Sequence, residues 1–134
     1  MTYDDNNSIG PSSSLFFVNS VLDYVKDKIP ASKLSMGIPV YYWGWTINPY
    51  IRIRSGGSYA RITGIKSSTA HISGFVAALG VSWLSYAYKT ERYLIWYEDK
   101  KSFGLKLDIV KNNKFRGFSA WVLGDEDPAI WSSL

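Results

Sequence analysis

The sequence contains no cysteine and a single histidine, which excludes a disulfide framework, a thiolate metal site and a histidine-rich zinc site. It contains no apolar run near the roughly 18 residues that a membrane-spanning helix needs, so we expect no membrane partner. It also contains no run of five or more like charges. Its 15 Lys and Arg residues are scattered, and the formal net charge of +4 therefore predicts no nucleic-acid partner. The polar, acidic start of the chain predicts no secretion signal.

Aromatic residues are what the sequence has in excess. Its 134 residues leave room for one modest core, yet they include six Trp and ten Tyr, which is more than such a core needs. An aromatic ring with a polar edge suits a binding surface, because one part of it is apolar and the other can hydrogen-bond. The flat apolar faces of sugars are one natural partner for such rings, and unpaired nucleobases are another.

The first third of the chain predicts a strand, a helix and a second strand. Residues 1–4 are short and suit the end of a strand. Apolar side chains at intervals of three and four predict a helix over residues 15–29, with Ser12 or Ser13 as its cap and a proline after its end. Residues 33–42 are mostly apolar on both faces, which is typical of a buried strand.

The middle of the chain has a different pattern of polar and apolar residues. Polar and apolar residues alternate over residues 46–68, which predicts short antiparallel strands joined by turns. Residues 70–79 are a candidate short helix, and residues 81–88 and 93–97 predict a hairpin. This stretch interrupts the alternation of strands and helices, so we interpret it as an insertion.

The last third returns to helix and strand. Residues 101–112 predict a helix capped by Asp99 or Ser102, residues 115–123 predict a second buried strand, and a last helix begins in residues 127–131. Strands that alternate with helices imply parallel pairing through right-handed crossovers. The sequence therefore predicts an α/β fold with a small α+β insertion.

Four motifs, in this order along the chain, resemble those of family 18 glycoside hydrolases, the chitinase family. They are Met-Thr-Tyr-Asp at 1–4 with Gly10-Pro11, Gly-Ile-Pro-Val-Tyr at 37–41, Ile-Trp-Tyr-Glu-Asp at 95–99 with Ser102 and Lys106, and Arg-Gly-Phe-Ser-Ala-Trp-Val-Leu-Gly at 116–124 with Trp131. The chain is especially similar to bacterial spore-cortex and cell-wall members, which cut N-acetylglucosamine-containing glycans. The resemblance covers nearly the whole chain.

The resemblance implies a partial (β/α)₈ TIM barrel, formed by the last three strand–helix units, with the insertion after the seventh strand. Residues 1–45 would hold barrel strands six and seven and the helix between them. Residues 46–99 would be the α+β chitinase-type insertion, and residues 100–134 the last barrel helix, the eighth strand and the start of a final helix. A complete barrel takes about 250 residues, so strands one to five would lie outside this sequence.

The resemblance also implies what the chain does. The family's acidic signature, Asp-x-x-Asp-x-Asp-x-Glu, ends in the acid that protonates the leaving oxygen, and no such spacing occurs in this sequence. The chain would be the carboxy-terminal piece of a glycosidase acting on chitin or peptidoglycan, with part of the sugar-binding cleft but inactive alone. A stand-alone carbohydrate-binding module is the alternative. The family uses the substrate's acetamido oxygen as nucleophile and needs no metal or organic cofactor.

The resemblance assigns five substrate-binding residues and no catalytic one. Tyr3 would orient the acetamido group, and Asp4 would bind a sugar hydroxyl. Tyr41 would line the same pocket, Trp121 would form its floor, and Met1 would pack under the sugar. The alternatives are a frayed terminus for the first residues and an ordinary core position for Trp121. Active sites of such barrels lie at the carboxyl ends of strands, and Tyr3, Asp4, Tyr41 and Trp121 are predicted near such ends.

Other polar residues carry less weight. The three consecutive acids at 125–127 do not converge on one point, so we expect them to stabilise the start of a helix. His71 has no evident partner, and a surface or packing role explains it better. Arg52 and Arg54 alternate on a strand, which places both on one face. We expect this face in solvent, and a face of the insertion turned toward the glycan is the minor alternative.

An incomplete barrel would leave unpaired strand edges and exposed apolar faces. We therefore expect a homo-oligomer, or pairing with the missing amino-terminal half of the barrel. The resemblance places the parent protein outside the cell, in the cell wall or in the spore.

Overall fold

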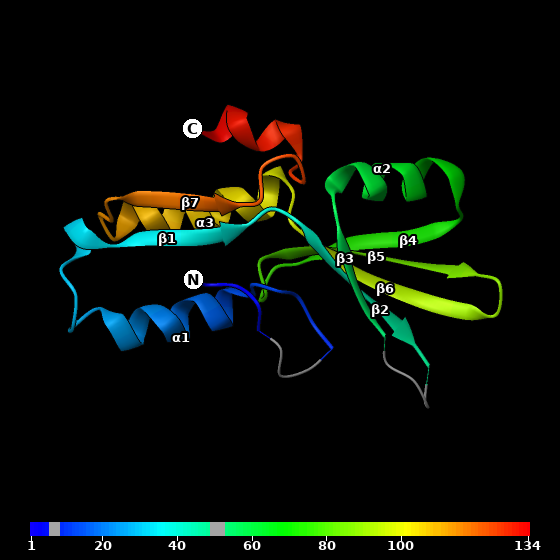
Figure 1. Cartoon of the computed structure of the whole chain (residues 1–134), viewed down its shortest axis with the longest axis horizontal. Helices are drawn as coiled ribbons and strands as arrows, with labels where there is room; N and C mark the ends of the chain where they lie inside the picture. The colour runs from blue at the N-terminus through cyan, green and yellow to red at the C-terminus, as the bar shows by residue number, and fades with distance from the viewer. Residues whose placement is uncertain (6–8, 49–52) are drawn as a thin grey trace.

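The structure, a computed structural model, describes residues 1–5, 9–48 and 53–134, which form two parts (Figure 1). The first part combines the strands β1 (Ser35–Pro39) and β7 (Gly117–Trp121) with the helices α1 (Leu15–Val25) and α3 (Lys100–Asn112) and the short 3-10 helices η1 (Ala31–Lys33) and η2 (Pro128–Ser133). The second part combines helix α2 (Tyr59–Ser68) with β2 (Tyr42–Ile47), β3 (Arg54–Gly57), β4 (His71–Val76), β5 (Val81–Tyr88) and β6 (Glu91–Tyr97). This is a mixed α/β fold, as predicted.

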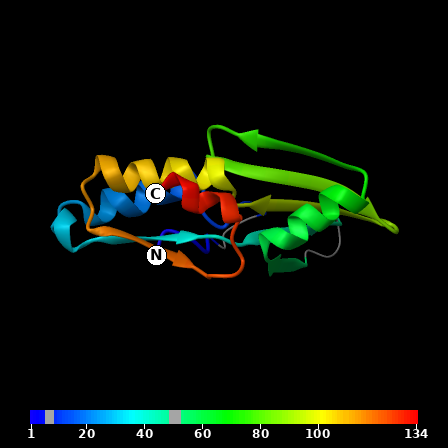
Figure 2. The same cartoon turned by 90° about the horizontal axis from the view of Figure 1, so that it is seen from above.

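The first part is built on a parallel strand pair. Ser35 of β1 lies opposite Gly117 of β7, and Pro39 lies opposite Trp121. Helices α1 and α3 lie on the same side of the pair (Figure 2) and close a core against it. The buried residues of this core are Val18, Met36, Ile38, Val40, Phe103, Leu107, Val110 and Ile130. β7 is shorter and more exposed than the buried strand predicted over residues 115–123, because within the described chain it pairs with β1 alone.

The second part is a five-stranded sheet in the order β3–β2–β6–β5–β4, and all its neighbouring strands are antiparallel. The hairpin predicted from residues 81–97 is confirmed as β5 and β6. Helix α2 covers one face of the sheet, where Ile62 is fully buried in a cluster with Leu84 and Ile95. The sheet begins at Tyr42, before the predicted start of the insertion at residue 46.

The structure corrects two predictions in the middle of the chain. Residues 70–79, predicted as a helix, contain β4 and the turn after it, because the β-branched and aromatic side chains of β4 pair it with β5. The turn ends at Gly80, whose φ of +65° favours glycine. Residues 59–68, predicted among short strands, form α2 instead, since Ile62 and Ile65 share one helical face and pack on the sheet.

The first residues of the chain run beside β1 without being a strand, in contrast to the strand predicted over residues 1–4. The backbone N–H of Thr2 donates to the carbonyl of Gly37 at 3.4 Å, and its hydroxyl donates to the same oxygen at 2.7 Å. The hydroxyl of Ser13 in turn donates to the Thr2 carbonyl at 2.6 Å. Side chains therefore take the place of a regular ladder here.

The predicted cap of α1 was also wrong by one or two positions. Ser14 caps the helix, and its hydroxyl accepts from the N–H of Phe17 at 3.1 Å. Ser12 and Ser13 are buried, and their hydroxyls bond to the segment at residues 2–4 instead. A capping rule considers only the residues next to the helix start, so it cannot predict these contacts with the segment at residues 2–4.

A buried ion pair and a cap join α3 to the end of β6. The ammonium of Lys106, which is fully buried, lies 2.9 Å from both carboxylate oxygens of Glu98. Burial raises the pKa of Glu98, and the charge of Lys106 opposes that rise. Asp99 is the N-cap of α3, as predicted, and it forms a reciprocal capping box with Ser102.

Candidate functional site

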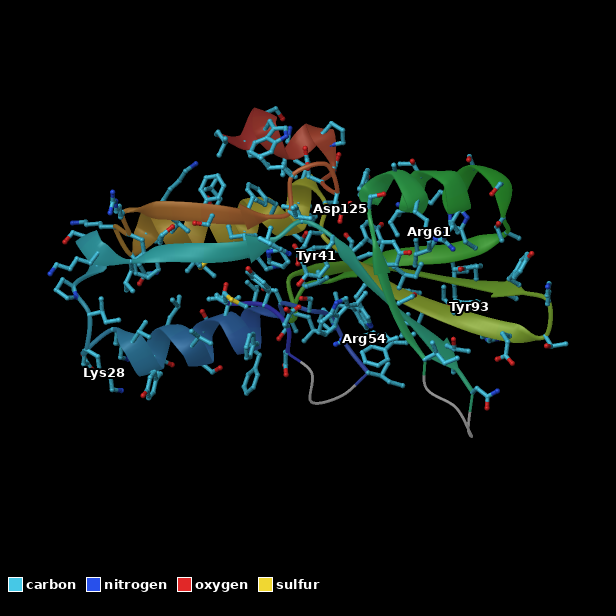
Figure 3. All side chains as sticks on the ribbon, viewed as in Figure 1. Lys28, Tyr41, Arg54, Arg61, Tyr93 and Asp125 are labelled. Carbon is cyan, nitrogen blue, oxygen red and sulfur yellow. The ribbon has the colours of Figure 1, made fainter. Side chains whose placement is uncertain are left out.

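An open cavity lies where the parallel strands end and the chain crosses into the five-stranded sheet. Its volume is about 370 Å³, and we call it the junction cavity. It is lined by Asp4, Tyr41, Trp43, Arg54, Gly56, Gly57, Trp121, Val122 and Asp125. Figure 3 shows Tyr41, Arg54 and Asp125 reaching this junction from different segments. The structure thus brings together three of the five predicted site residues: Asp4, Tyr41 and Trp121.

Three side chains at the junction cavity form a hydrogen-bonded group, the Asp4–Ser12–Tyr41 cluster. The hydroxyl of Tyr41 donates to Oδ1 of Asp4 at 2.5 Å. The Ser12 hydroxyl oxygen lies 3.0 Å from the Tyr41 oxygen and 3.4 Å from Oδ1 of Asp4. Burial, followed by the bond to Asp4, raises the pKa of Tyr41 well above its usual range, so the phenol keeps its proton at neutral pH.

The backbone of Asp4 is held in an uncommon conformation by the same cluster. Its φ is +67°, a left-handed region that Asp tolerates better than most side chains. The N–H of Asp4 donates to the Ser12 hydroxyl oxygen at 3.0 Å, and the N–H of Asp5 donates to the Ser12 carbonyl at 3.1 Å. Ser12 thereby holds both peptide units at this turn.

Trp121 presents an apolar surface to the junction cavity. It is the last residue of β7, and it remains 59% exposed. Its carbonyl accepts from the N–H of Val40 at 2.9 Å, which fixes the backbone of Trp121 at the end of the parallel pair. The alternative of an ordinary core Trp does not fit so exposed a ring. An exposed indole beside polar groups suits a ligand that has both apolar faces and hydroxyl groups.

The β2–β3 edge of the junction cavity is formed by Trp43 and Arg54. The guanidinium of Arg54 lies 4.3 Å from the centre of the Trp43 ring, a cation–π arrangement that favours this position for the charge. Trp43 itself is buried and packs edge-to-face against Trp45. Arg54 is exposed, as predicted, and it also lines the open cavity, which agrees with the glycan-facing alternative. Arg52 lies outside the described residues.

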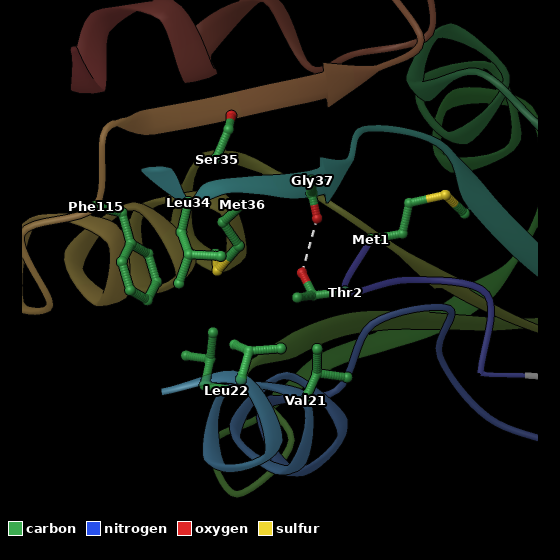
Figure 4. A pocket seen from close by; sticks show the side chains of 10 residues that line it. Met1, Thr2, Val21, Leu22, Leu34, Ser35, Met36, Gly37 and Phe115 are labelled. Atoms are coloured by element: carbon green, nitrogen blue, oxygen red, sulfur yellow. Dashed lines mark hydrogen bonds between the residues drawn. The ribbon is translucent and has the colours of Figure 1, made fainter. Parts of the chain in front are cut away.

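Tyr3 and Met1 are placed differently from the other predicted residues. Tyr3 does not line the junction cavity; its ring packs edge-to-face against Tyr41, with centroids 6.3 Å apart. Met1 is 77% exposed and borders a separate apolar hollow of about 90 Å³ between α1 and β1, together with Val21 and Phe115 (Figure 4). In this structure Tyr3 packs against Tyr41 without lining the junction cavity, and Met1 lies away from that cavity.

The remaining acids near this site have separate tasks. Asp127 caps η2 by accepting from the N–H of Ala129 at 3.0 Å, as predicted for this acidic run. Glu126 accepts from the N–H of Gly124, and backbone hydrogen bonds lower its pKa. Asp125 lines the junction cavity. His71 contributes to no site described here, since its Nδ1 lies 2.9 Å from the carbonyl of Thr69.

The sequence does not single out Ser12 or Asp125 as residues of this site, and it offers a glycan-facing Arg54 only as the minor alternative. Ser12 and Tyr41 are 29 positions apart, and nothing in the local pattern of either segment predicts their contact. The strand alternation does place Arg54 on one face of β3, but it cannot say that this face borders a cavity. The sequence pattern presents Asp125 only as the first acid of a run before a helix.

Two kinds of feature are absent from the residues that the structure describes. Within residues 1–5, 9–48 and 53–134, no three or more His, Asp or Glu side chains gather as metal ligands would. No helix of these same residues has both the length and the apolar character needed to cross a membrane.

Comparison with known sequences gives a family match. The model of the family described as glycosyl hydrolases family 18 matches residues 1–127. The uncharacterized glycosylase YvbX of Bacillus subtilis is 30% identical over 140 residues, and the cortical fragment-lytic enzyme of the same bacterium is 29% identical over 144 residues. Both matches cover the whole chain, which spans only 40% and 32% of the relatives' own lengths.

Comparison with solved structures agrees. A chitinase from Chromobacterium violaceum superposes with a TM-score of 0.88 at 26% identity, over 99% of this chain and 42% of the chitinase. The spore cortex-lytic enzyme SleL of Bacillus megaterium superposes with a TM-score of 0.87 at 27% identity, over 98% of this chain and 31% of that enzyme.

Proposed function

Because the chain belongs to glycosyl hydrolase family 18, we propose that it supplies part of the saccharide-binding cleft of an enzyme acting on N-acetylglucosamine-containing glycans. The junction cavity is the part of the cleft that this chain contributes. Asp4, Tyr41 and Trp121 are its ligand-binding residues, with Tyr3 supporting Tyr41 from behind.

One observation carries this proposal above the others. The exposed indole of Trp121 and the Asp4–Ser12–Tyr41 cluster line one cavity, although they come from opposite ends of the chain. A sugar ring has an apolar face that can stack on an indole and hydroxyl or amide groups at its rim that need polar partners. The junction cavity offers both.

The chain by itself binds and does not cleave. No Asp-x-x-Asp-x-Asp-x-Glu spacing occurs in its sequence, and the one carboxylate of the cluster, Asp4, already accepts from Tyr41. In the family that acidic motif supplies the proton to the leaving group. Binding without hydrolysis is also what a stand-alone carbohydrate-binding module would show.

The glycan that we propose is peptidoglycan or chitin. Relatives of the chain include a cortical fragment-lytic enzyme and a spore cortex-lytic enzyme, and another similar structure is a chitinase. These relatives favour a cell-wall or spore location for the protein in which this chain works.

We further propose that the first part of the fold corresponds to the last three strand–helix units of a (β/α)₈ barrel, with residues 1–5 beside β1 in the place of the first of these strands and the antiparallel sheet as the insertion. The parallel β1–β7 pair, the helices on one side of it and the apolar hollow beside Met1 support this assignment (Figures 2 and 4). Unpaired edges then favour self-association or pairing with the rest of a barrel. A single monomeric species in sedimentation at micromolar concentration would argue against self-association.

The test is calorimetric titration of the purified chain with chitotetraose, together with an assay of a fluorogenic chito-oligosaccharide. We expect binding without turnover. Trp121→Ala removes the apolar platform and is expected to weaken binding about tenfold, the equivalent of about 1.4 kcal/mol. Trp131→Ala is the matched control, because Trp131 is also partly exposed but lies outside the junction cavity. Absence of binding by the unmodified chain would overturn the proposal, and turnover would overturn the claim of inactivity.

A further inference from the structure

The Asp4–Ser12–Tyr41 cluster determines which of its oxygens carries each proton. An ionised carboxylate can only accept, so the one phenolic proton of Tyr41 is donated to Oδ1 of Asp4, 2.5 Å away. The Ser12 oxygen accepts from the N–H of Asp4 at 3.0 Å, and its own proton needs an acceptor. The Tyr41 oxygen at 3.0 Å is the better acceptor, because Oδ1 of Asp4 lies 3.4 Å away. The order of donation is therefore Ser12 to Tyr41 to Asp4.

This order changes what Tyr41 offers to a ligand. Its proton is used by Asp4, so the phenol has no donor left for the junction cavity. The oxygen keeps some acceptor capacity, since a hydroxyl oxygen has two lone pairs and Ser12 occupies one of them. Tyr41 accordingly presents an acceptor to the junction cavity, and a bound molecule must bring an N–H or O–H group to it.

We propose that Ser12 is a positioning residue that holds Asp4 and Tyr41 in this arrangement and so keeps Tyr41 an acceptor for a donor group of the bound sugar, an amide N–H or a hydroxyl. The inference rests on the function proposed above and adds the polarity of one contact within that site. Ser12 is only 5% exposed and does not line the junction cavity, so it acts through Tyr41 and Asp4 rather than by touching the sugar.

Ser12 also holds the backbone that carries the carboxylate. It binds the N–H groups of Asp4 and Asp5, and Asp4 has a positive φ between those two bonds. Removing the hydroxyl leaves the N–H of Asp4 without its partner and lets the Asp4 carboxylate shift relative to the Tyr41 hydroxyl that donates to it. Both changes spoil the acceptor geometry without removing any atom that touches the ligand.

The experiment compares two adjacent buried serines. Ser12→Ala removes the cluster hydroxyl. Ser13→Ala removes a hydroxyl that is fully buried and donates only to the carbonyl of Thr2, away from the junction cavity. Calorimetric titration with chitotetraose and thermal unfolding are measured for each variant. We expect Ser12→Ala to weaken binding about threefold to tenfold, the effect of one neutral hydrogen bond, while Ser13→Ala lowers only the unfolding temperature.

A double-mutant cycle separates positioning from general loosening of the loop. In a Tyr41→Phe background, Ser12→Ala is expected to cause a much smaller loss of affinity than in the unmodified chain, because the acceptor that it positions is gone and only its hold on Asp4 remains. Ser12→Cys, close in size to serine but a weak donor, is expected to behave like Ser12→Ala and serves if the alanine variant does not fold.

The role of Ser12 and the proposed binding function would be contradicted by different results. Equal losses in the Ser12 and Ser13 variants, an undiminished affinity in Ser12→Ala, or a full additional loss in the Tyr41→Phe background would each overturn the role of Ser12 while leaving the site intact. Absence of chitotetraose binding by the unmodified chain would overturn the proposed function, and the role of Ser12 with it.

Discussion

The two parts of this molecule differ in how far apart in the sequence their contacting residues lie. The parallel pair brings together β1 and β7, so that the hydroxyls of Ser35 and Ser119, 84 positions apart, lie 3.0 Å from each other. In the five-stranded sheet, β4, β5 and β6 follow one another through short turns, and α2 covers the face that they form with β2. Its core closes largely within one continuous stretch of sequence.

This difference implies that the antiparallel sheet depends less on the rest of the fold than the parallel pair does. The antiparallel sheet carries its own helix and buries Ile62 and Leu84 completely. The parallel pair can form only when β7 is present, and β7 follows both that sheet and α3 in the sequence. Contacts that tie the sheet to α1 and α3 should therefore control the first part of the fold more than the second, and three of them can be cut one at a time.

The largest effect is expected from Lys106→Met. Glu98 is 5% exposed, and the substitution would leave its carboxylate buried without the ammonium that lies 2.9 Å from both of its oxygens. Breaking such a pair costs about 3 to 5 kcal/mol. Urea unfolding should show this loss, and hydrogen exchange should show weaker protection in α3 and β1 than in β5.

Two controls define that result. Lys111→Met alters the exposed last turn of the same helix and should change stability by less than about 1 kcal/mol. Glu98→Leu combined with Lys106→Met should recover most of the loss, because an apolar pair leaves no buried charge. A loss below about 1 kcal/mol for Lys106→Met alone would mean that the pair does not anchor α3.

A smaller effect is expected from Gly80→Ala, at the contact between the β4–β5 turn and α1. A methyl group there would lie 2.5 Å from Cγ of Leu15, and Gly80 has a φ of +65°. Crowding of this kind costs about 1 to 3 kcal/mol. Gly104→Ala is the matched control: it lies within α3 with open space around it, so alanine should stabilise by about 0.5 to 1 kcal/mol. A neutral Gly80→Ala in thermal unfolding would show that α1 can move away at no cost.

The same contrast explains how much of the fold could be predicted. The β5–β6 hairpin and the α3 helix were predicted from sequence, because strand alternation, helical spacing and the Asp99 cap are local signals. Residues 70–79 were predicted as a helix, since their apolar side chains allow either structure and only pairing with β5 makes them a strand. The short extent of β7 depends on the number of its neighbours, which no local pattern contains.

Several residues of the candidate site could be predicted from the sequence, but the contacts that bring them together could not. The family motifs in the sequence point to Asp4, Tyr41 and Trp121, and these three residues line the junction cavity. Their roles in binding remain predictions. Ser12 could not be found this way, because its task arises only where the loop at residues 9–14 folds back on Tyr41.

The smallest effect is expected from Asp99→Ala. One carboxylate oxygen accepts from the N–H of Ser102 at the start of α3, and the other accepts from the hydroxyl of Ser82 in β5 at 2.5 Å. Losing an N-cap costs about 1 kcal/mol, and Asp99→Asn, which keeps an acceptor, should lose less. If the cap acts only on α3, Ser82→Ala should add its own separate loss in the Asp99→Ala background. If Asp99 ties the sheet to the helix, Ser82→Ala should add little further loss in the Asp99→Ala background. The bond between Ser82 and Asp99 then belongs with the contacts that hold the first part of the fold in place.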